Sequence, residues 1–282
     1  MKLEFTVKKE QDDIKRILID DLKISREQII KIKNENILVN NQKYKIYQKV
    51  YKGDQITIDF GYYEDNSNIV PNSDIKFEIL YEDDWLLIVN KPKFIPVHPT
   101  MRHYDDSLSN GVKNYYDKIN LHKKIRPVNR LDKNTTGIVM FAKSEYIQSN
   151  LKKYQKEYIA IVDGKLEGSG TINKKIARKE NSIIERCISD NGQEAITHYE
   201  VLKNYKDYTL VKCILETGKT HQIRVHLASI GHSILGDSLY GSESTLIDRQ
   251  ALHAYKITFI HPVSKKKITI VADIPEDMKK IL

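Results

Sequence analysis

The stretch "RPVNRLDKNTTGIVMFAKS" (residues 126–144) joins a polar turn to an apolar run and fixes how the surrounding chain folds. Residues 138–141 are continuously apolar, which is typical of a strand buried in a sheet. Directly before this run, Asp132 stands among Lys, Asn and Thr residues that favour a turn. We therefore expect Asp132 in a loop at the mouth of a buried strand, where loops on a rigid scaffold commonly carry chemistry.

The chain on either side of this stretch continues the β-rich pattern. Apolar runs separated by turn residues occur at residues 77–92, 157–166, 196–216 and 253–275. A few helical patterns interrupt these runs, but strands and helices do not alternate regularly. The sequence therefore predicts an α+β fold with a mixed, largely antiparallel sheet rather than a doubly wound parallel sheet.

The N-terminal part carries a different pattern of short elements. Apolar residues within 12–22 and 25–33 fall on one face of a helix, and Ser25 is suited to cap the second helix. Residues 35–60 are typical of short strands with Asn-Asn and Gly-Asp turns between them. Two short helices and a small group of strands are therefore expected before residue 60.

Domain boundaries follow from a change in composition. Residues 61–74 are rich in Asn, Ser, Asp and Pro and have no sustained period, which is typical of a linker. We expect a small α+β domain at residues 1–60, a linker at 61–74 and a large domain at 75–282.

Composition and charge describe an ordinary globular chain with a basic bias. The 282 residues are 40% hydrophobic, and 46 Lys and Arg against 38 Asp and Glu give a formal charge of +8. This balance favours a polyanionic partner and equally suits a Lys-rich solvated surface. Residues 26–52 contain seven basic residues and only two acidic ones, Glu27 and Glu35, so part of the positive charge is concentrated in this segment.

Targeting and cysteine patterns point to a cytosolic chain, for which we expect a monomer. Cys187 and Cys213 are the only cysteines and form no CxxC pair, so neither a disulfide framework nor a zinc ribbon is indicated. The N-terminus meets acidic residues before any signal-like apolar region, and no apolar run is long enough to span a bilayer.

The stretch "ETGKTHQIRVHLASIGH" (residues 216–232) contains a Gly-Lys-Thr triplet and two histidines, which invite comparison with phosphate-loop and zinc motifs. A phosphate loop needs a Gly five residues before Gly218, and that position is Cys213. His221 and His226 lack the spacing and the intervening Glu of a helical zinc motif. We therefore expect neither a nucleotide cofactor nor a metal.

The same stretch predicts the start of a helix. Thr220 is suited to cap it, and His221, Gln222 and Arg224 would lie in its first turns, close to exposed amides that can hold an anion. The alternative is an ordinary solvated helix face. Tyr158 falls in an alternating strand pattern, and on that pattern alone it is a half-buried strand aromatic.

Five blocks, in order, resemble the RluA family of RNA pseudouridine synthases over almost the whole chain. They are "ILYEDDWLLIVNKPKFIPVHPT" (79–100), "VNRLDKNTTGIVMFAKS" (128–144), "KEYIAIVDG" (156–164), "TGKTHQIRVHLASIGHSILGDSLYG" (217–241) and "LHAYKITFIHP" (252–262). Residues 12 to about 60 resemble the S4-like RNA-binding domain, which often precedes this catalytic domain.

The resemblance implies a catalytic site of three residues. The Asp of the family's "RLD" corresponds to Asp132, which would be the nucleophile when the uridine N-glycosidic bond breaks and the base rejoins through carbon 5. The Arg of "HQIR" corresponds to Arg224, which would keep Asp132 charged and aimed. The block Tyr corresponds to Tyr158, which would stack on the uracil and take part in removing the carbon 5 proton.

RNA contacts are implied at two places. Near the catalytic residues they are Arg130, Lys219, His221 and Gln222, and in the N-terminal domain they are Arg26, Lys31 and Lys33. Arg130 would fill the space left by an extruded uridine or make an ordinary phosphate contact. This sequence departs from the family pattern at Asn129 (usually His), Thr136 (usually Ser) and Lys219 (usually Arg).

The accessory domain implies large-subunit ribosomal RNA as the substrate, with transfer RNA as the alternative. Two other functions stay open on the residues alone. A non-catalytic RNA-binding protein would keep this scaffold, although it would be expected to lose the catalytic Asp, Tyr or Arg. A glycosidase would need a second carboxylate near Asp132, for which Asp105, Asp106 and Asp237 are candidates.

Overall fold

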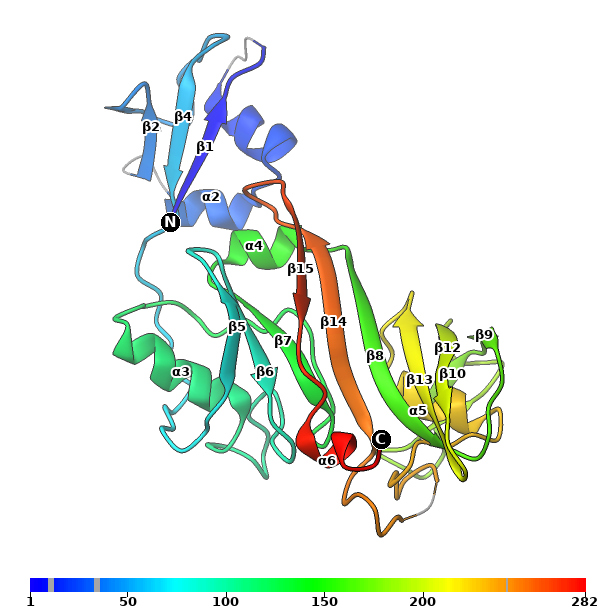
Figure 1. Cartoon of the computed structure of the whole chain (residues 1–282). Coiled ribbons are helices and arrows are strands. Elements are labelled where there is room, and N and C mark those ends of the chain that lie inside the picture. The colour runs from blue at the N-terminus through cyan, green and yellow to red at the C-terminus, as the bar shows by residue number, and fades with distance from the viewer. Residues whose placement is uncertain (10–12, 33–35, 242) are drawn as a thin grey trace.

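The computed structural model describes residues 1–9, 13–32, 36–241 and 243–282. It contains a small N-terminal unit and a larger unit built on one long, strongly twisted sheet (Figure 1).

The small unit is a four-stranded antiparallel sheet with short helical segments beside it. The strand order is β1 (Lys2–Thr6), β4 (Gln55–Asp59), β2 (Ile37–Val39) and β3 (Gln42–Lys43). The helical segments are α1 (Ile14–Arg16), the π-helical η1 (Ile17–Asp21) and α2 (Arg26–Ile32). The two predicted helices and the short strands after them are confirmed. Strand β1 was not predicted. The predicted helix ends at residues 12 and 33 lie outside the described residues.

Local side chains explain where these elements begin and turn. Ser25 Oγ accepts the Gln28 N–H at 3.2 Å and Gln28 Oε1 accepts the Ser25 N–H at 3.0 Å, so α2 starts on a reciprocal capping box. Asn40 and Asn41 both have positive φ, at 51° and 66°, as a two-residue hairpin turn between β2 and β3 requires.

The large unit is a nine-stranded mixed sheet. Its order is β5 (Glu78–Glu82), β6 (Leu86–Lys91), β7 (Thr136–Ala142), β14 (Leu252–Ile260), β8 (Tyr154–Asp163), β13 (Tyr208–Leu215), β12 (Ile196–Asn204) and β9 (Ser169–Asn173), with β15 (Lys267–Val271) also paired to β14. Only the β7–β14 pair is parallel. The predicted mixed, largely antiparallel sheet is confirmed.

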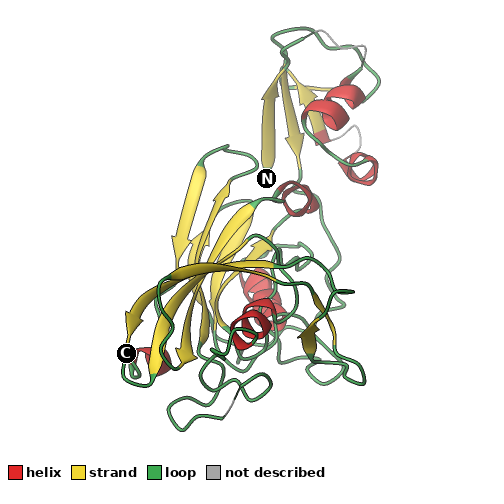
Figure 2. Cartoon of the chain, turned by 90° about the vertical axis from the view of Figure 1, so that its right-hand side faces the viewer, coloured by secondary structure: helices red, strands yellow, loops and turns green. Residues whose placement is uncertain are grey.

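Helices and a short hairpin complete the large unit. They are α3 (Leu108–Lys118), α4 (Glu145–Asn150), α5 (Gln222–Ala228), α6 (Glu276–Lys279) and the hairpin of β10 (Ile176–Arg178) and β11 (Arg186–Ile188). The turned view shows how the long strands curve past the helices (Figure 2).

Strand β7 is buried along its whole length because both faces of the sheet are covered at this point. Val139 and Phe141 belong to a core with α3, while Ile138 and Met140 belong to the core that continues into the small unit. The side chains of residues 138–141 therefore belong to two cores, one on each face of the sheet. The loop before β7 lies at the edge of this packed region.

Gly137 sets the position of that loop. It has a φ of +110°, and a Cβ atom there would lie 2.3 Å from the backbone oxygen of Ala254 on β14. Only glycine allows this approach, which brings the start of β7 against β14. Asp132 then lies in a turn in which its carbonyl accepts the Thr135 N–H at 3.1 Å.

Residues 61–77 form no helix or strand but are held by buried contacts. Glu64 accepts two hydrogen bonds from Arg126, at 2.8 and 2.6 Å, and Asn66 Nδ2 donates to the carbonyl of Lys123 at 2.9 Å. Just before this segment, Phe60 packs on Trp85 and Tyr146, with ring centroids 5.7 and 5.2 Å away. The segment has the composition of a linker, yet it lies fixed on the large unit.

Candidate active site

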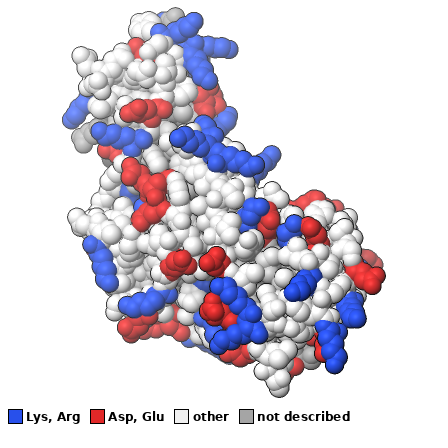
Figure 3. Space-filling model, viewed as in Figure 1, with Lys and Arg blue, Asp and Glu red and all other residues white. Residues whose placement is uncertain are grey.

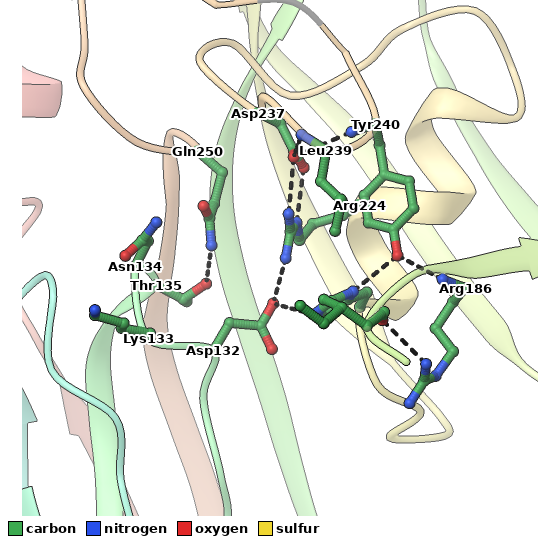
Figure 4. Close-up of polar contacts among 12 residues, drawn as sticks. Asp132, Lys133, Asn134, Thr135, Arg186, Arg224, Asp237, Leu239, Tyr240 and Gln250 are labelled. Atoms are coloured by element: carbon green, nitrogen blue, oxygen red, sulfur yellow. Dashed lines mark hydrogen bonds and ion pairs between the residues drawn. The ribbon is translucent and has the colours of Figure 1, made fainter. Parts of the chain in front are cut away.

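Asp132 lies in a pocket where the loop before β7 meets the start of α5. Arg224 Nη1 donates to Asp132 Oδ2 at 3.0 Å (Figure 4). The same guanidinium donates through Nε and Nη2 to the two carboxylate oxygens of Asp237, at 2.7 and 2.8 Å. Because Asp237 occupies one edge of the planar group, the remaining donor is aimed at Asp132.

Asp237 is a buried anchor rather than a second catalytic acid. Its side chain is 0% exposed, and its Oδ1 also accepts the backbone N–H groups of Leu239 and Tyr240 at 3.1 and 3.3 Å. A carboxylate with both oxygens occupied inside the protein cannot reach a substrate. The position that sequence offered for a glycosidase acid therefore holds Arg224 in place.

The prediction that Thr220 caps α5 is wrong. The helix begins at Gln222, and its N-cap is His221 in a left-handed conformation with a φ of +59°. Gln222 is buried: its Oε1 accepts from Thr217 Oγ1 and the Lys219 N–H, and its Nε2 donates to Ile196 O and Thr197 Oγ1. The Gln222 side chain thus holds the turn before the helix and does not face solvent.

His221 approaches the same Asp132 oxygen as Arg224 does. Its Nε2 is 3.7 Å from Asp132 Oδ2, and its Nδ1 is 2.8 Å from the hydroxyl of Tyr240. That hydroxyl accepts the backbone N–H of Arg186 at 2.8 Å, so its own proton is free to point at Nδ1 and leave the ring proton on Nε2. Burial lowers the pKa of His221, although the Asp132 charge opposes this shift.

Tyr158 projects from β8 into the same pocket. Burial, followed by the charge of Asp132 and the nearby Tyr154, raises the pKa of its hydroxyl far above the ordinary value. Among the described residues, no group forms a hydrogen bond with this hydroxyl. The Tyr158 hydroxyl therefore stays protonated at neutral pH and is available to a ligand.

The pocket around Asp132 is narrow, about 70 Å³. Tyr158, Leu131 and Leu252 are among its apolar lining residues, and Arg130 and Lys219 also line it. Arg130 is exposed and Lys219 half-buried.

The remaining predicted residues lie in different surroundings. Arg26 is exposed at the start of α2, Lys31 forms an ion pair with Glu145 of α4, and Lys33 lies outside the described residues. Asn129 is buried and pairs with the backbone of β7 through Ile138 O and the Met140 N–H. Thr136, the second departure from the family pattern, pairs through its hydroxyl with the buried His253 at 2.9 Å. The side chains of Asn129 and Thr136 thus make contacts inside the protein.

Sequence reasoning missed Tyr240 and Lys91 as parts of this site. Lys91 is fully buried and donates to the carbonyls of Pro92, Ile95 and Lys133, each at 2.9 Å. Burial and the charge of Arg249 lower its pKa to about 7, against the effect of Asp132. The bond to Lys133 fixes the residue after Asp132, and the sequence Asn-Lys-Pro at the end of β6 does not by itself reveal such a contact.

Within residues 1–9, 13–32, 36–241 and 243–282, no three His, Cys, Asp or Glu side chains gather in a way that could hold a metal ion. In the same part of the chain, no helix is long and apolar enough to cross a membrane.

Comparisons with known proteins agree on one family. A family profile described as RNA pseudouridylate synthase matches residues 85–229. An uncharacterized RNA pseudouridine synthase of Bacillus subtilis, YhcT, is 40% identical over 263 residues, covering 90% of this chain and 84% of that protein. Ribosomal large subunit pseudouridine synthase D of Escherichia coli is 34% identical over 272 residues, covering 89% and 83%. Human RNA pseudouridylate synthase domain containing 1 has the same fold, with 23% identity, a TM-score of 0.60 and 73% and 86% coverage.

Proposed function

The chain belongs to the RluA family of RNA pseudouridine synthases, and from this membership we propose that it converts uridine to pseudouridine in large-subunit ribosomal RNA with Asp132 as the nucleophile. The observation that carries the proposal is the position of the Asp132 carboxylate, which is held by an anchored Arg224 in a pocket walled by Tyr158. The relatives named for the large ribosomal subunit support the choice of RNA.

The reaction needs only groups that the chain supplies. The Asp132 carboxylate attacks the sugar, or stabilises its positive charge, as the N-glycosidic bond breaks and the uracil turns. Carbon 5 then bonds to the sugar, and any bond between Asp132 and the sugar breaks. Carbon 5 loses its proton, and the nitrogen that lost the sugar gains one. The product is an isomer of the substrate, so no electrons or atoms enter from outside. Arg224 is already fixed by Asp237, so little reorganisation of the guanidinium is required as the negative charge on Asp132 is lost and restored during the reaction.

Tyr158 is proposed to act through its neutral hydroxyl and its ring. Its raised pKa disfavours a tyrosinate base, so the hydroxyl would accept the carbon 5 proton only while passing its own proton onward. The ring provides an apolar wall on which a uracil can stack.

Arg130 is proposed to move when the uridine enters. A uridine within a helix must be extruded, at a cost of a few kcal/mol. The pocket of about 70 Å³ is too small while Arg130 lines it, so this exposed side chain must swing outward. Outside the pocket it would reach the space that the base has left, or a nearby phosphate.

The small N-terminal unit is proposed to be an S4-like RNA-binding domain. On the face seen in Figure 3, Lys and Arg side chains lie at the edges of this unit, with Asp and Glu among them, and near its junction with the large unit. Phosphate contacts from such residues set affinity and register but carry little sequence information. Arg26 is exposed and suited to this role, while the ion pair of Lys31 with Glu145 joins the two units instead.

Pseudouridine mapping of total RNA from cells with and without this gene tests the proposal. We expect at least one modified position to disappear from large-subunit ribosomal RNA. Loss confined to transfer RNA would reject the choice of RNA and keep the enzyme class. An unchanged map would reject the proposed activity in that organism's RNA altogether.

A further inference from the structure

A second pocket, of about 540 Å³, lies beside the active site at the base of the β10–β11 hairpin. Its lining includes the side chains of Arg178, Arg186 and Lys219 and the turn at Gly192 and Gln193. Lys219 also lines the pocket around Asp132, so the two pockets are neighbours.

The charge of this pocket is not neutralised by the protein. Its lining contains three cationic side chains and no Asp or Glu. Within the part of the chain that the structure describes, none of these three forms an ion pair with a carboxylate, although many other Lys and Arg residues do. Three cationic residues that line one pocket without a carboxylate among its lining residues favour an anionic ligand.

Two backbone segments that line the pocket, at Ile176 and at Gly192 and Gln193, pack directly against each other. The backbones of Ile176 and Gln193 exchange two hydrogen bonds of 2.9 Å, and a Cβ atom on Gly192 would lie 2.5 Å from the carbonyl carbon of Ile176. Arg186 Nη1 donates to the carbonyls of Ile184 and Glu185, both at 3.0 Å, which fixes its guanidinium at the hairpin. The cations are therefore presented on a defined surface.

A chain of hydrogen bonds fixes this surface relative to the catalytic residues. The Arg186 N–H donates to the Tyr240 hydroxyl, which contacts His221, whose Nε2 faces Asp132 at 3.7 Å. A ligand in the basic pocket would thus sit at a set distance from a uridine at Asp132.

We infer that this basic pocket binds the phosphodiester of a nucleotide next to the target uridine in the same RNA strand. The inference rests on the proposed function, because it places the neighbouring nucleotide relative to an extruded uridine. A phosphate matches the three cations, and a volume of about 540 Å³ accommodates its nucleoside as well. Arg178, which is exposed and points no donor at another described residue, is the side chain expected to contact it most directly.

The test replaces Arg178 with Ala, Gln and Lys in the full chain. The control is Lys206→Ala, which removes one exposed positive charge at the turn between β12 and β13, outside the pocket. Single-turnover tritium release from transcribed large-subunit ribosomal RNA labelled at carbon 5 of uridine gives the half-saturating enzyme concentration and the maximal rate. Filter binding of the same RNA gives affinity independently of chemistry, and circular dichroism checks folding.

Loss of one phosphate contact should lower the slope of log affinity against log salt by about 0.7 to 0.9 in Arg178→Ala and Arg178→Gln. Between 50 and 200 mM salt, the wild type should therefore lose about threefold more affinity than either variant loses. The maximal rate should change less than twofold. Arg178→Lys should restore most of the slope, and Lys206→Ala should match the wild type.

An unchanged slope in folded Arg178→Ala or Arg178→Gln would overturn the inference. An equal loss in Lys206→Ala would also overturn it, because the effect would then come from overall charge. If Arg178→Ala fails to fold, the comparison of Gln with Lys at this position decides. Failure of the proposed function looks different, since the wild type would then release no tritium while filter binding still reports the slope.

Discussion

Replacing Asp237 with Asn should damage both stability and catalysis, because this carboxylate anchors Arg224. The two charged groups meet through bonds of 2.7 and 2.8 Å, and their side chains are 0% and 8% exposed. An Asn in this place keeps one acceptor, but it turns an N–H group toward a guanidinium that has only donors. Arg224 would then lose half of its clamp while it remains buried.

The size of both effects follows from this burial. Breaking a buried ion pair by altering one partner costs about 3 to 5 kcal/mol. Because Asn keeps one acceptor for Arg224, we expect the lower value, about 3 kcal/mol. For a chain of this length, that corresponds to a fall in Tm of about 6 °C. A guanidinium displaced by about 1 Å would no longer aim at Asp132, and we expect kcat to fall about 100-fold.

Thermal unfolding and single-turnover tritium release on the same preparations separate the two effects. Glu64→Gln is the matched control, because Glu64 and Arg126 form an equally buried pair with bonds of 2.8 and 2.6 Å away from Asp132. Both variants should lose similar stability, and only Asp237→Asn should lose activity. Wild-type kcat in Asp237→Asn, together with a lowered Tm, would refute the claim that this clamp aims Arg224 at Asp132.

Three further predictions test other parts of the structure. Tyr158→Phe should bind RNA normally and form no product, and normal turnover would reduce the residue to a stacking surface. Deleting residues 1–58, which keeps Phe60 on its aromatic partners, should weaken RNA binding and flatten its salt dependence; a lower Tm with an unchanged slope would show that the unit only packs. Burial by itself would raise the pKa of Glu64, but the hydrogen bonds and the charge of Arg126 outweigh burial, so the pKa lies below its usual value. The ionised Glu64 therefore stabilises the fold above its unfolded pKa of about 4.3, and this contribution is lost as pH falls. When pH is lowered from 5 to 3, the free energy of unfolding measured with denaturant should fall more in the wild type than in Glu64→Gln. Equal losses in the two proteins would contradict the assignment.

The sequence predicted those elements whose pattern is local and strong. The apolar run within β7 and the alternation in β13 depend on neighbouring residues, so they could be read from the chain. The alternation expected around Tyr158 was wrong, because β8 is buried continuously from Glu157 to Val162 and Tyr158 is buried rather than half-buried. Strand β1 was missed because it is a short edge strand with only Leu3 buried. Its place in the sheet comes from pairing with β4, whose residues lie far along the chain, from Thr6 with Gln55 to Lys2 with Asp59.

The site was only partly predictable for the same reason. Asp132, Tyr158 and Arg224 were expected together through a resemblance, and the structure places them in one pocket. The anchoring of Arg224 by Asp237 could not be read, since an Asp after Gly is also typical of a simple turn. The Thr220 cap failed because backbone conformation decided the helix start: His221 takes a positive φ, and Gln222 ties the turn to β12.

The measurement that tests the central claim most directly is tritium release by Asp132→Asn on ribosomal RNA labelled at carbon 5 of uridine. The neutral amide keeps the shape of the side chain but provides neither a nucleophile nor a charge at the sugar. We expect the wild type to release tritium, and Asp132→Asn to bind the same RNA without any release above background. Turnover by a folded Asp132→Asn preparation that is free of wild-type enzyme would contradict the assignment of Asp132 as the nucleophile.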